Sequence, residues 1–430
     1  MNILSLFFVS YKKYKKGGIF ILYGSSKIWL NDLDKTQLQQ LQRLALLSRD
    51  LYNLSIKTAS EHYAETGVVL DFQQVKALIK DKEEYKEITG YYYGVVLSGI
   101  ADFKKYVNTN SYVKDKSKRT LELKNLSDFR PPMPKTQFYP IMLLKVVVRD
   151  GFVILPPTKH TGEIKLKLPE NYKDKSISRV TVRPLFQFKS WQMIIEYPVE
   201  AVKHNNIEKN KSMGIDLGIN NFATVALSDG SCFIIDGKPL KNILQGYCKF
   251  RAKMTSESGG QHNTKRLISL HRKTQCKIDD YVRKSVNYII KYCLDNHIGK
   301  VVLGWGIHFM TFDLGINNQM YSLFPFARFK DLLCFKCKQY SIDFETVDES
   351  FTSVASFLDG DQMPEHVVRE KQNFSGKRRY RGLYVSKNGT KINADVNGAL
   401  NILRKGNAVI NIDLSGRGIA TPKRVNPLKV

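Results

Sequence analysis

The second half of the chain alternates short apolar runs with segments of helical periodicity. The run from Met213 to Leu227 predicts an apolar strand that places Asp216 among glycines and then continues as a second strand. The pattern then predicts a basic helical region over about 240–296, a strand over 300–303, a helix over 325–340, a strand over 341–348 and a final helix that opens at Asp395. This mixture of strands and helices favours a multidomain chain of the α/β and α+β classes.

In the first half of the chain, helices interrupt a series of strands. Residues from about 1 to 30 alternate apolar and polar positions, which is typical of strands. Asp34 with Gln37 resembles a capping box, and leucines recur after it at helical spacing. Then follow a helix after Asp71, a helix over about 91–106, and strands between 138 and 200, the first of them over 142–148. This order predicts a helical block inserted in a small β-barrel.

The charge of the chain indicates a polyanionic partner. Among 430 residues, 67 Lys and Arg stand against 40 Asp and Glu, which gives a net charge of +27. Each phosphate that a protein neutralises releases counterions, so this excess favours nucleic acid over a membrane surface. The six cysteines are scattered and form no disulfide framework, which fits a reducing cytosol. No apolar run is long enough to span a bilayer.

Two aspartates are candidates for chemistry. Asp216 and Asp395 come from separate elements, and such carboxylates can share divalent metal ions that drive hydrolysis of a phosphodiester. The order of elements is that of an RNase H-like fold, in which the first and fourth strands lie side by side. An acid normally ends the fourth strand, but Gly304 and Gly306 stand at that place here.

The strand that follows can supply the missing acid. It ends in Asp348-Glu349, and in a parallel sheet this end emerges beside the end of the fourth strand. The longer side chain of Glu349 can reach the shared metals, and the two glycines would leave it room. We therefore predict that Asp216, Glu349 and Asp395 are the catalytic and metal-binding set. Asp348 remains the alternative, because successive residues of a strand face opposite ways.

A group of motifs resembles those of TnpB, the RNA-guided DNA nuclease carried by insertion sequences and related to type V CRISPR effectors. The resemblance is strongest over residues 211–408. The motifs are Gly214-Ile-Asp-Leu-Gly218, Asn318-Gln319 with Phe324-Pro-Phe326, Glu349-Ser-Phe-Thr-Ser-Val-Ala-Ser-Phe-Leu-Asp359, Phe374-Ser-Gly-Lys-Arg378, Arg381-Gly-Leu-Tyr384 and Asn393-Ala-Asp-Val-Asn-Gly398. The first half of the chain looks like the family's other domains only in its pattern of elements.

The resemblance implies a division of the chain into domains. The expected parts are a β-barrel wedge domain (1–33 and 135–205), an inserted helical recognition domain (34–134), a RuvC-like, RNase H-like nuclease domain (211–349 and 393–408), a target-nucleic-acid-binding insertion (350–392) and a C-terminal tail (409–430).

The resemblance also implies an activity and partners. We expect an RNA-guided endonuclease that uses two Mg²⁺ ions and cleaves double-stranded target DNA next to a short flanking motif. Its guide RNA would derive from a transposon end, and its place would be the prokaryotic cytoplasm, at the nucleoid. We expect no membrane partner. The oligomeric state stays open, with one protein copy per RNA as the expectation.

The chain departs from the family pattern in two ways. Many members carry two cysteine pairs that build a zinc ribbon, but the stretch 353–359 holds no cysteine, so we expect no zinc. Cys334 and Cys337 have the spacing of half a site, but they stand on a predicted helix, and core packing is the better interpretation. The missing fourth-strand acid resembles a subgroup in which that acid is displaced to Glu349.

Two other functions stay open, the first of them because of the missing acid. One is a nuclease-dead relative of TnpB that acts as an RNA-guided DNA-binding transcriptional regulator. The other is a transposase that joins DNA strands.

Basic clusters are the candidates for contact with nucleic acid. One cluster, next to the last acid in sequence, consists of Lys377, Arg378, Arg379, Tyr380 and Arg381, and a second contains Lys114, Lys116, Lys118 and Arg119. The basic region from Arg251 to Lys277 is a candidate lining for a channel that holds an RNA–DNA hybrid.

Overall fold

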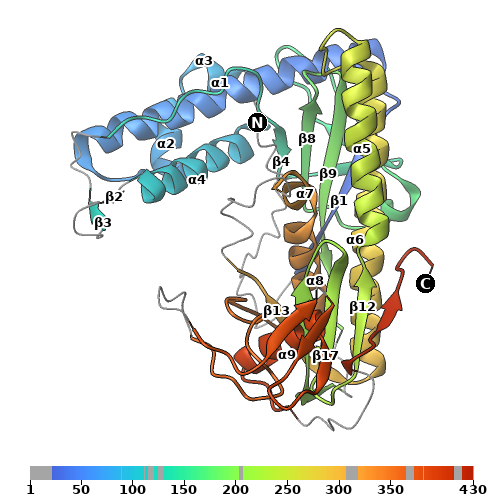
Figure 1. Cartoon of the computed structure of the whole chain (residues 1–430). Helices are drawn as coiled ribbons and strands as arrows, with labels where there is room; N and C mark the ends of the chain where they lie inside the picture. Colours follow the sequence, from blue (N-terminus) through green and yellow to red (C-terminus); the bar gives the residue numbers. More distant parts are fainter. Residues whose placement is uncertain are drawn as a thin grey trace. The chain divides into compact units, whose positions relative to one another are not determined.

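The structure, a computed structural model, describes residues 22–88, 90–110, 112–114, 121–123, 129–202, 207–306, 318–364, 372–380, 382–410 and 419–429. The chain divides into two units, Tyr23–Val199 and the part from Glu200 onward, each with its own core (Figure 1). In the described residues, no helix combines the length and the apolar character that crossing a bilayer requires.

The first unit contains a helical block between two strands of one sheet. Its helices are α1 (Lys35–Thr66), α2 (Phe72–Ile79), α3 (Glu83–Lys86) and α4 (Tyr92–Asn110). The predicted capping box is confirmed, because the Asp34 carboxylate accepts from the Gln37 N–H and the Gln37 side chain accepts from the Asp34 N–H. A second such box, formed by Asp71 and Gln74, starts α2.

One strand of the first unit precedes the helical block in sequence, and the others follow it. They are β1 (Leu22–Leu30), β2 (Tyr112–Lys114), β3 (Leu121–Leu123), β4 (Ile141–Leu143), β5 (Val147–Arg149), β6 (Phe152–Leu155), β7 (Ile164–Lys167), β8 (Arg179–Leu185) and β9 (Ser190–Val199). The order β1-β9-β8-β4 makes one sheet and β5-β6-β7 another. The closed barrel and the boundary between two domains stay predictions, since one core joins helices and strands. The single strand predicted over 142–148 is wrong, because a bend separates β4 from β5.

The second unit is built on a mixed sheet with the order β14-β13-β10-β11-β12-β18. The strands are β10 (Glu208–Leu217), β11 (Asn221–Leu227), β12 (Cys232–Asp236), β13 (Ile298–Gly304), β14 (Asp343–Val347) and β18 (Lys423–Val425). Strands β10 and β13 run parallel, with Gly214 opposite Val302, and β14 runs parallel to β13. This arrangement confirms the predicted neighbourhood of the first, fourth and fifth strands.

Helices cover both faces of this sheet. They are α5 (Lys238–Glu257), α6 (Lys265–Asp295), α7 (Asn318–Leu323), α8 (Phe326–Gln339) and α9 (Ala394–Lys405). Met213 and Ile215 of β10 pack in the core that contains α6 and α8, and Cys337 is buried there on α8, as predicted. Gly214 lies between them in sequence and therefore faces the other way, towards α9.

Two segments contain strands that the sequence pattern did not predict. The stretch 350–391 contains the small antiparallel sheet β15 (Lys377–Tyr380), β16 (Leu383–Val385) and β17 (Lys391–Asn393). The predicted tail after residue 409 contains β18, which extends the main sheet by pairing in parallel with β12. All side chains of β15 are exposed, so no apolar alternation marks it, and β18 has only Val425 buried.

Gly214 lets α9 approach the sheet very closely. A Cβ atom at this position would lie 2.3 Å from the carbonyl oxygen of Ala399 and 2.9 Å from the Cβ of Leu403. Both neighbours belong to α9, and a carbonyl oxygen in a helix cannot move aside alone. The absence of a side chain at Gly214 therefore sets the distance between β10 and α9, the two elements that carry Asp216 and Asp395.

We expect Gly214→Ala to destabilise the protein because it forces α9 away from β10. Overpacking of this kind costs about 1–3 kcal/mol, and a backbone contact belongs at the upper end of that range. Urea-induced unfolding followed by far-UV circular dichroism measures the loss. Gly246→Ala is the matched control: no atom lies within 4 Å of a Cβ there, and alanine in a helix gains up to about 1 kcal/mol. Equal stability of both variants would contradict the prediction.

Candidate active site

Asp216 lies near the end of β10 and faces α9. Its side chain is half-buried. A Cβ atom at Gly398 of α9 would come within 2.8 Å of Oδ2 of Asp216, so a second glycine makes room for the carboxylate. The carboxylate thus lies directly against the helix that carries Asp395.

Asp395 stands in the first turn of α9, where a negative charge is favourable next to the helix N-terminus. The side chain of Asn393 caps the helix and accepts from the N–H groups of Asp395 and Val396. Both carboxylate oxygens of Asp395 have partners. Oδ1 accepts from Arg378 at 3.0 Å, and Oδ2 accepts from Nδ2 of Asn221 at 2.5 Å.

Glu349 follows β14 and is half-buried. Its side chain lies against Gly306, where a Cβ atom would come within 2.7 Å of its Cγ and Oε1. Gly306 therefore leaves room for this carboxylate, as the sequence predicted. Gly304 does not, because a Cβ atom there would meet Ile402 of α9 instead.

Asp395 and Glu349 lie near enough for their charges to act on Asp216. Burial raises the pKa of Asp216 well above its ordinary value, and the charges of Asp395 and Glu349 raise it further, while Arg378 acts in the opposite direction. Burial also raises the pKa of Glu349 to about 7, with a smaller contribution from Asp348. Carboxylates that are held close together without enough positive charge are destabilised as anions, and a divalent cation removes that cost.

The donor set fits Mg²⁺ in its chemistry, since this ion prefers carboxylate oxygens. In the described residues, however, no three His, Cys, Asp or Glu side chains are already gathered closely enough to hold one ion. The guanidinium of Arg378 provides positive charge beside Asp395 and engages its Oδ1. The positive charge of Arg378 therefore opposes a second cation at Asp395 for as long as this contact is kept.

Asp348 has a different environment from Glu349. Its Oδ1 accepts from the N–H of Ser350 at 3.3 Å, which is a local turn contact. Of these two acids, Glu349 alone contributes to the raised pKa of Asp216. Which of the two is the third acid stays a prediction.

The basic cluster that starts at Lys377 is a strand of the small sheet. Lys377, Arg378, Arg379 and Tyr380 form β15, and all four are exposed, with 74% of the Tyr380 surface accessible. Through Arg378 this strand contacts Asp395 directly. Arg381, Lys116, Lys118 and Arg119 lie outside the described residues, as does the side chain of Lys114, so their predicted contacts stay predictions.

Carboxylate-to-amide hydrogen bonds fasten the insertion that carries β15. Asp361 accepts from the N–H groups of Ser356 at 2.8 Å and Ser375 at 3.0 Å, which ties two distant segments together. Asp359 accepts from the N–H of Lys387 at 2.9 Å in the loop after β16. These bonds lie in the insertion for which the sequence predicts no zinc, and that expectation stays a prediction.

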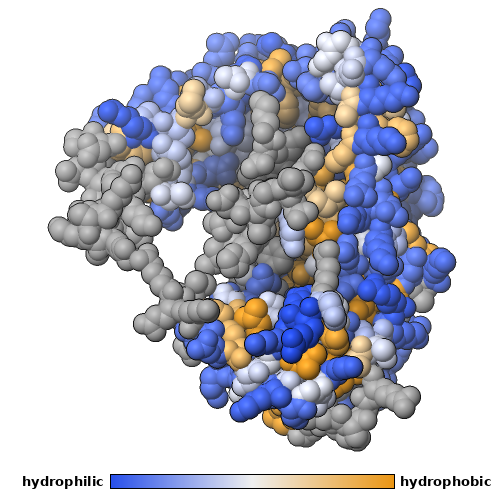
Figure 2. Space-filling view, viewed as in Figure 1, coloured by the Kyte–Doolittle hydropathy of each residue, from blue (hydrophilic) through white to orange (hydrophobic). Residues whose placement is uncertain are grey.

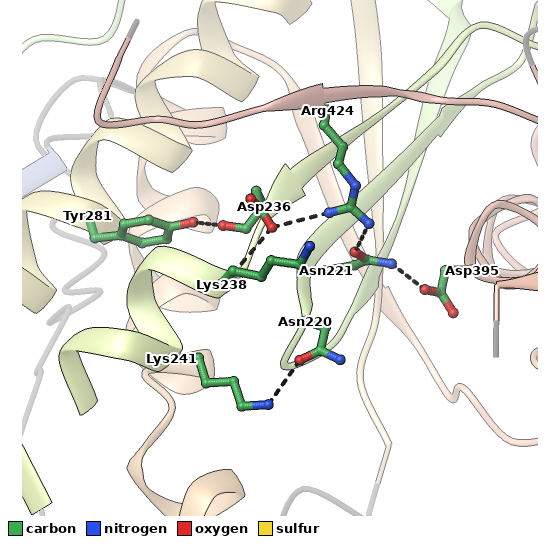
Figure 3. A network of polar contacts seen from close by, with 8 residues as sticks. All are labelled: Asn220, Asn221, Asp236, Lys238, Lys241, Tyr281, Asp395 and Arg424. Atoms are coloured by element: carbon green, nitrogen blue, oxygen red, sulfur yellow. Dashed lines mark hydrogen bonds and ion pairs between the residues drawn. The ribbon is translucent and has the colours of Figure 1, made fainter. Parts of the chain in front are cut away.

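Sequence reasoning missed Asn221 and Arg424. Asn221, at the start of β11, contacts Asp395 on one side and Arg424 of β18 on the other (Figure 3). The sequence pattern did not mark them as site residues, because Asn221 is a neutral amide inside a strand and Arg424 lies in the predicted tail. Their contacts appear only once β18 is seen to join the sheet.

Comparison with known proteins agrees with this architecture. Residues 194–305 match the family OrfB_IS605, described as a probable transposase, and residues 326–402 match the Cas12f1-like TNB domain. The TnpB-like protein ORF457 of Acidianus two-tailed virus is 26% identical over 211 residues, which are 47% of this chain and 43% of that protein. The match thus spans less than half the length of this curated relative.

Among solved structures that match, one is similar in fold over most of the chain. The cryo-EM structure of a Cas12f1–sgRNA–target DNA complex superposes with a TM-score of 0.52 at 14% identity, over 85% of this chain and 81% of that one. The sequence matches and this fold define a protein with an OrfB_IS605-type segment followed by a Cas12f1-like TNB segment. Within that class, the resemblance to TnpB that the motifs predicted is confirmed.

We expect Asp361 to make the stability of the insertion depend on pH. Burial alone would raise its pKa, but the hydrogen bonds from Ser375 and Ser356 and the charge of Arg404 outweigh it and lower the pKa. A lowered pKa stabilises the fold above the unfolded-state value and loses this effect as the pH falls through the folded-state value. The stability difference between the wild type and Asp361→Asn should therefore narrow below about pH 4.

Amide hydrogen exchange of residues 372–380 measures the stability difference between the two proteins. The exchange rates are followed between pH 6 and pH 3 and corrected for the intrinsic rates. Asp343→Asn is the control, since Asp343 is an exposed carboxylate of β14. A difference between wild type and Asp361→Asn that stays constant over this range would count against the prediction.

Proposed function

We propose that this protein is an RNA-guided, Mg²⁺-dependent DNA endonuclease of the TnpB type. One observation carries the proposal. Asp216, Glu349 and Asp395 come from a strand, a loop and a helix far apart in the chain, and they meet electrostatically beside a strand of exposed basic residues. Acids that converge next to positive charge suit the cleavage of a polyanion.

The carboxylates hold the metal ions in this proposal. Mg²⁺, when bound there, supplies an activated water and stabilises the leaving oxygen of the phosphodiester. Asp216 and Asp395 would be the shared ligands, and Glu349 would complete the set. Arg378 neutralises Asp395 while no phosphate is present, and its exposed position lets it turn to a phosphate oxygen when DNA enters.

Other basic surfaces would hold the nucleic acids by their backbones. Lys377 and Arg379 flank Arg378 on the exposed strand β15. Hydrophilic residues cover much of the surface over α5 and α6 (Figure 2). The exposed side chains of these helices include Lys249, Arg251, Lys253, Lys273 and Lys277. In this proposal the RNA provides sequence specificity by base pairing, and the protein holds the hybrid and reads a short flanking motif.

The alternative is an RNA-guided regulator that binds DNA without cutting it. The engagement of Asp395 by Arg378, and the lack of a preformed cluster of three ligands in the described residues, favour this second candidate. The two functions differ in one measurable property, which is hydrolysis that depends on Mg²⁺.

The test uses the protein together with the RNA that copurifies with it, and DNA matched to that RNA. We expect cleavage with Mg²⁺ and none with EDTA. Asp395→Ala should abolish cleavage and leave guided binding nearly unchanged, because the side chain is a metal ligand and not a DNA contact in this proposal. Gel-based cleavage and filter-binding assays measure the two properties. Stable guided binding by the wild type without any cutting in Mg²⁺ would reject the nuclease in favour of the regulator.

The third acid can be identified by two amide substitutions that preserve side-chain shape. We expect Glu349→Gln to lower the cleavage rate by more than about 100-fold, which exceeds the usual loss for an outer-shell partner. Asp348→Asn should change the rate less than about tenfold, because Asp348 only adds charge near Glu349. Single-turnover cleavage at saturating Mg²⁺ separates them. The reverse ranking would assign the role to Asp348.

A further inference from the structure

The side-chain amide of Asn221 bridges the C-terminal strand and the candidate active site. Its Oδ1 accepts from Arg424 at 2.7 Å, and its Nδ2 donates to Oδ2 of Asp395 at 2.5 Å (Figure 3). Asn221 and Asp395 are 174 residues apart in sequence, and Asn221 and Arg424 are 203 residues apart. Three separate segments of the chain therefore meet at one amide group.

The two partners of Asn221 fix the orientation of its amide. A guanidinium can only donate hydrogen bonds, and an ionised carboxylate can only accept them. A flipped amide would place its NH₂ group against Arg424 and its oxygen against Asp395, so both contacts would become repulsive. Without Arg424 the amide loses one of the two partners that oppose this flip, and only Asp395 still opposes it. Arg424 therefore restrains how Asn221 presents its N–H to Asp395.

Arg424 is itself held by the sheet. Its NH1 group contacts Oδ1 of Asp236 at 3.1 Å, and its strand β18 pairs in parallel with β12, with Arg424 opposite Ile234. Asp236 is fixed in turn, since its Oδ1 accepts from the N–H of Lys238 and its carbonyl oxygen accepts from the hydroxyl of Tyr281 (Figure 3). A continuous set of contacts therefore runs from α6 and β12 through Arg424 and Asn221 to Asp395.

We propose that Arg424 is a positioning residue of the metal site, and that it acts through Asn221 to hold the Asp395 carboxylate in the orientation that receives a divalent cation. The inference rests on the proposed function, which makes Asp395 a metal ligand. A carboxylate oxygen has lone pairs for a hydrogen bond and a cation together, so Asn221 can keep its contact with Oδ2 when metal binds. The C-terminal strand then completes the site although it supplies no ligand.

If Arg424 only stabilised the fold, we would expect a different effect of its removal on metal affinity. The Arg424 side chain is 45% exposed, and an exposed ion pair with Asp236 contributes little to stability. In a structural role, removing Arg424 would change metal affinity no more than removing any other charge from β18. Lys423 offers that comparison, because it is an exposed cation on the same strand.

The experiment measures Mn²⁺, used as a probe for Mg²⁺, bound to the full chain. Electron paramagnetic resonance of free Mn²⁺ gives the affinity, and the signal that Asp395→Ala removes defines the site. We expect Arg424→Ala to weaken this binding by about 10-fold or more, within the range for outer-shell partners. Arg424→Lys should recover part of it, because a lysine can still donate to Asn221. Lys423→Ala should bind Mn²⁺ like the wild type.

A double-mutant cycle tests whether Arg424 acts through Asn221. In an Asn221→Ala background, the further change Arg424→Ala should have almost no added effect on Mn²⁺ affinity, since the intermediary is already absent. Additive losses would overturn the inference, and so would equal affinities of Arg424→Ala and Lys423→Ala. Thermal unfolding of each variant checks that the fold is retained.

The Mn²⁺-binding test of Arg424 can fail or succeed independently of the cleavage test of the proposed nuclease. If wild-type protein binds Mn²⁺ in a manner that depends on Asp395 and Arg424, but its RNA complex never cuts matched DNA, the inference stands and the nuclease is rejected. If Mn²⁺ binding does not depend on Asp395 at all, the inference is overturned.

Discussion

The close contact between α9 and the central strand β10 is the constraint on which the candidate site depends. Two glycines make it possible, Gly214 beneath the helix backbone and Gly398 beside the Asp216 carboxylate. A side chain at Gly214 would push the helix outwards and separate the two aspartates, whereas a side chain at Gly398 would displace the Asp216 carboxylate. Residues without functional groups therefore set the positions of the acids, and the geometry of the site depends on packing as well as on charge.

This packing creates an electrostatic problem that the neighbouring residues partly solve. Burial and mutual repulsion disfavour the ionised form of Asp216, and Glu349 is similarly affected by its burial. Arg378 and Asn221 each take one oxygen of Asp395, so this acid has both a cation and a neutral donor beside it. The two contacts differ in kind. The arginine stands on an exposed strand of the insertion, whereas the amide belongs to the main sheet.

The sequence predicted the parts of the fold that leave a periodic or chemical pattern. Asp216 and Asp395 could be selected because apolar elements and recognisable motifs surround them, and Glu349 followed from the order of parallel strands. Strand β15 could not be found, since four exposed residues carry no alternation of buried positions. Strand β18 escaped for a similar reason, and with it Arg424. Asn221 was overlooked because an amide has no charge and acquires its role only from two partners that are remote in sequence.

The wide separation of the acids along the chain has a consequence for folding. Contacts between distant residues form late, because a long loop must close before they gain any stability. In the proposed nuclease, a partly folded chain with only β10 to β12 in place would carry Asp216 but neither Glu349 nor Asp395. Such an intermediate could bind nucleic acid through its charge without harming it. In that nuclease, cutting would require α9 to dock, because α9 carries Asp395.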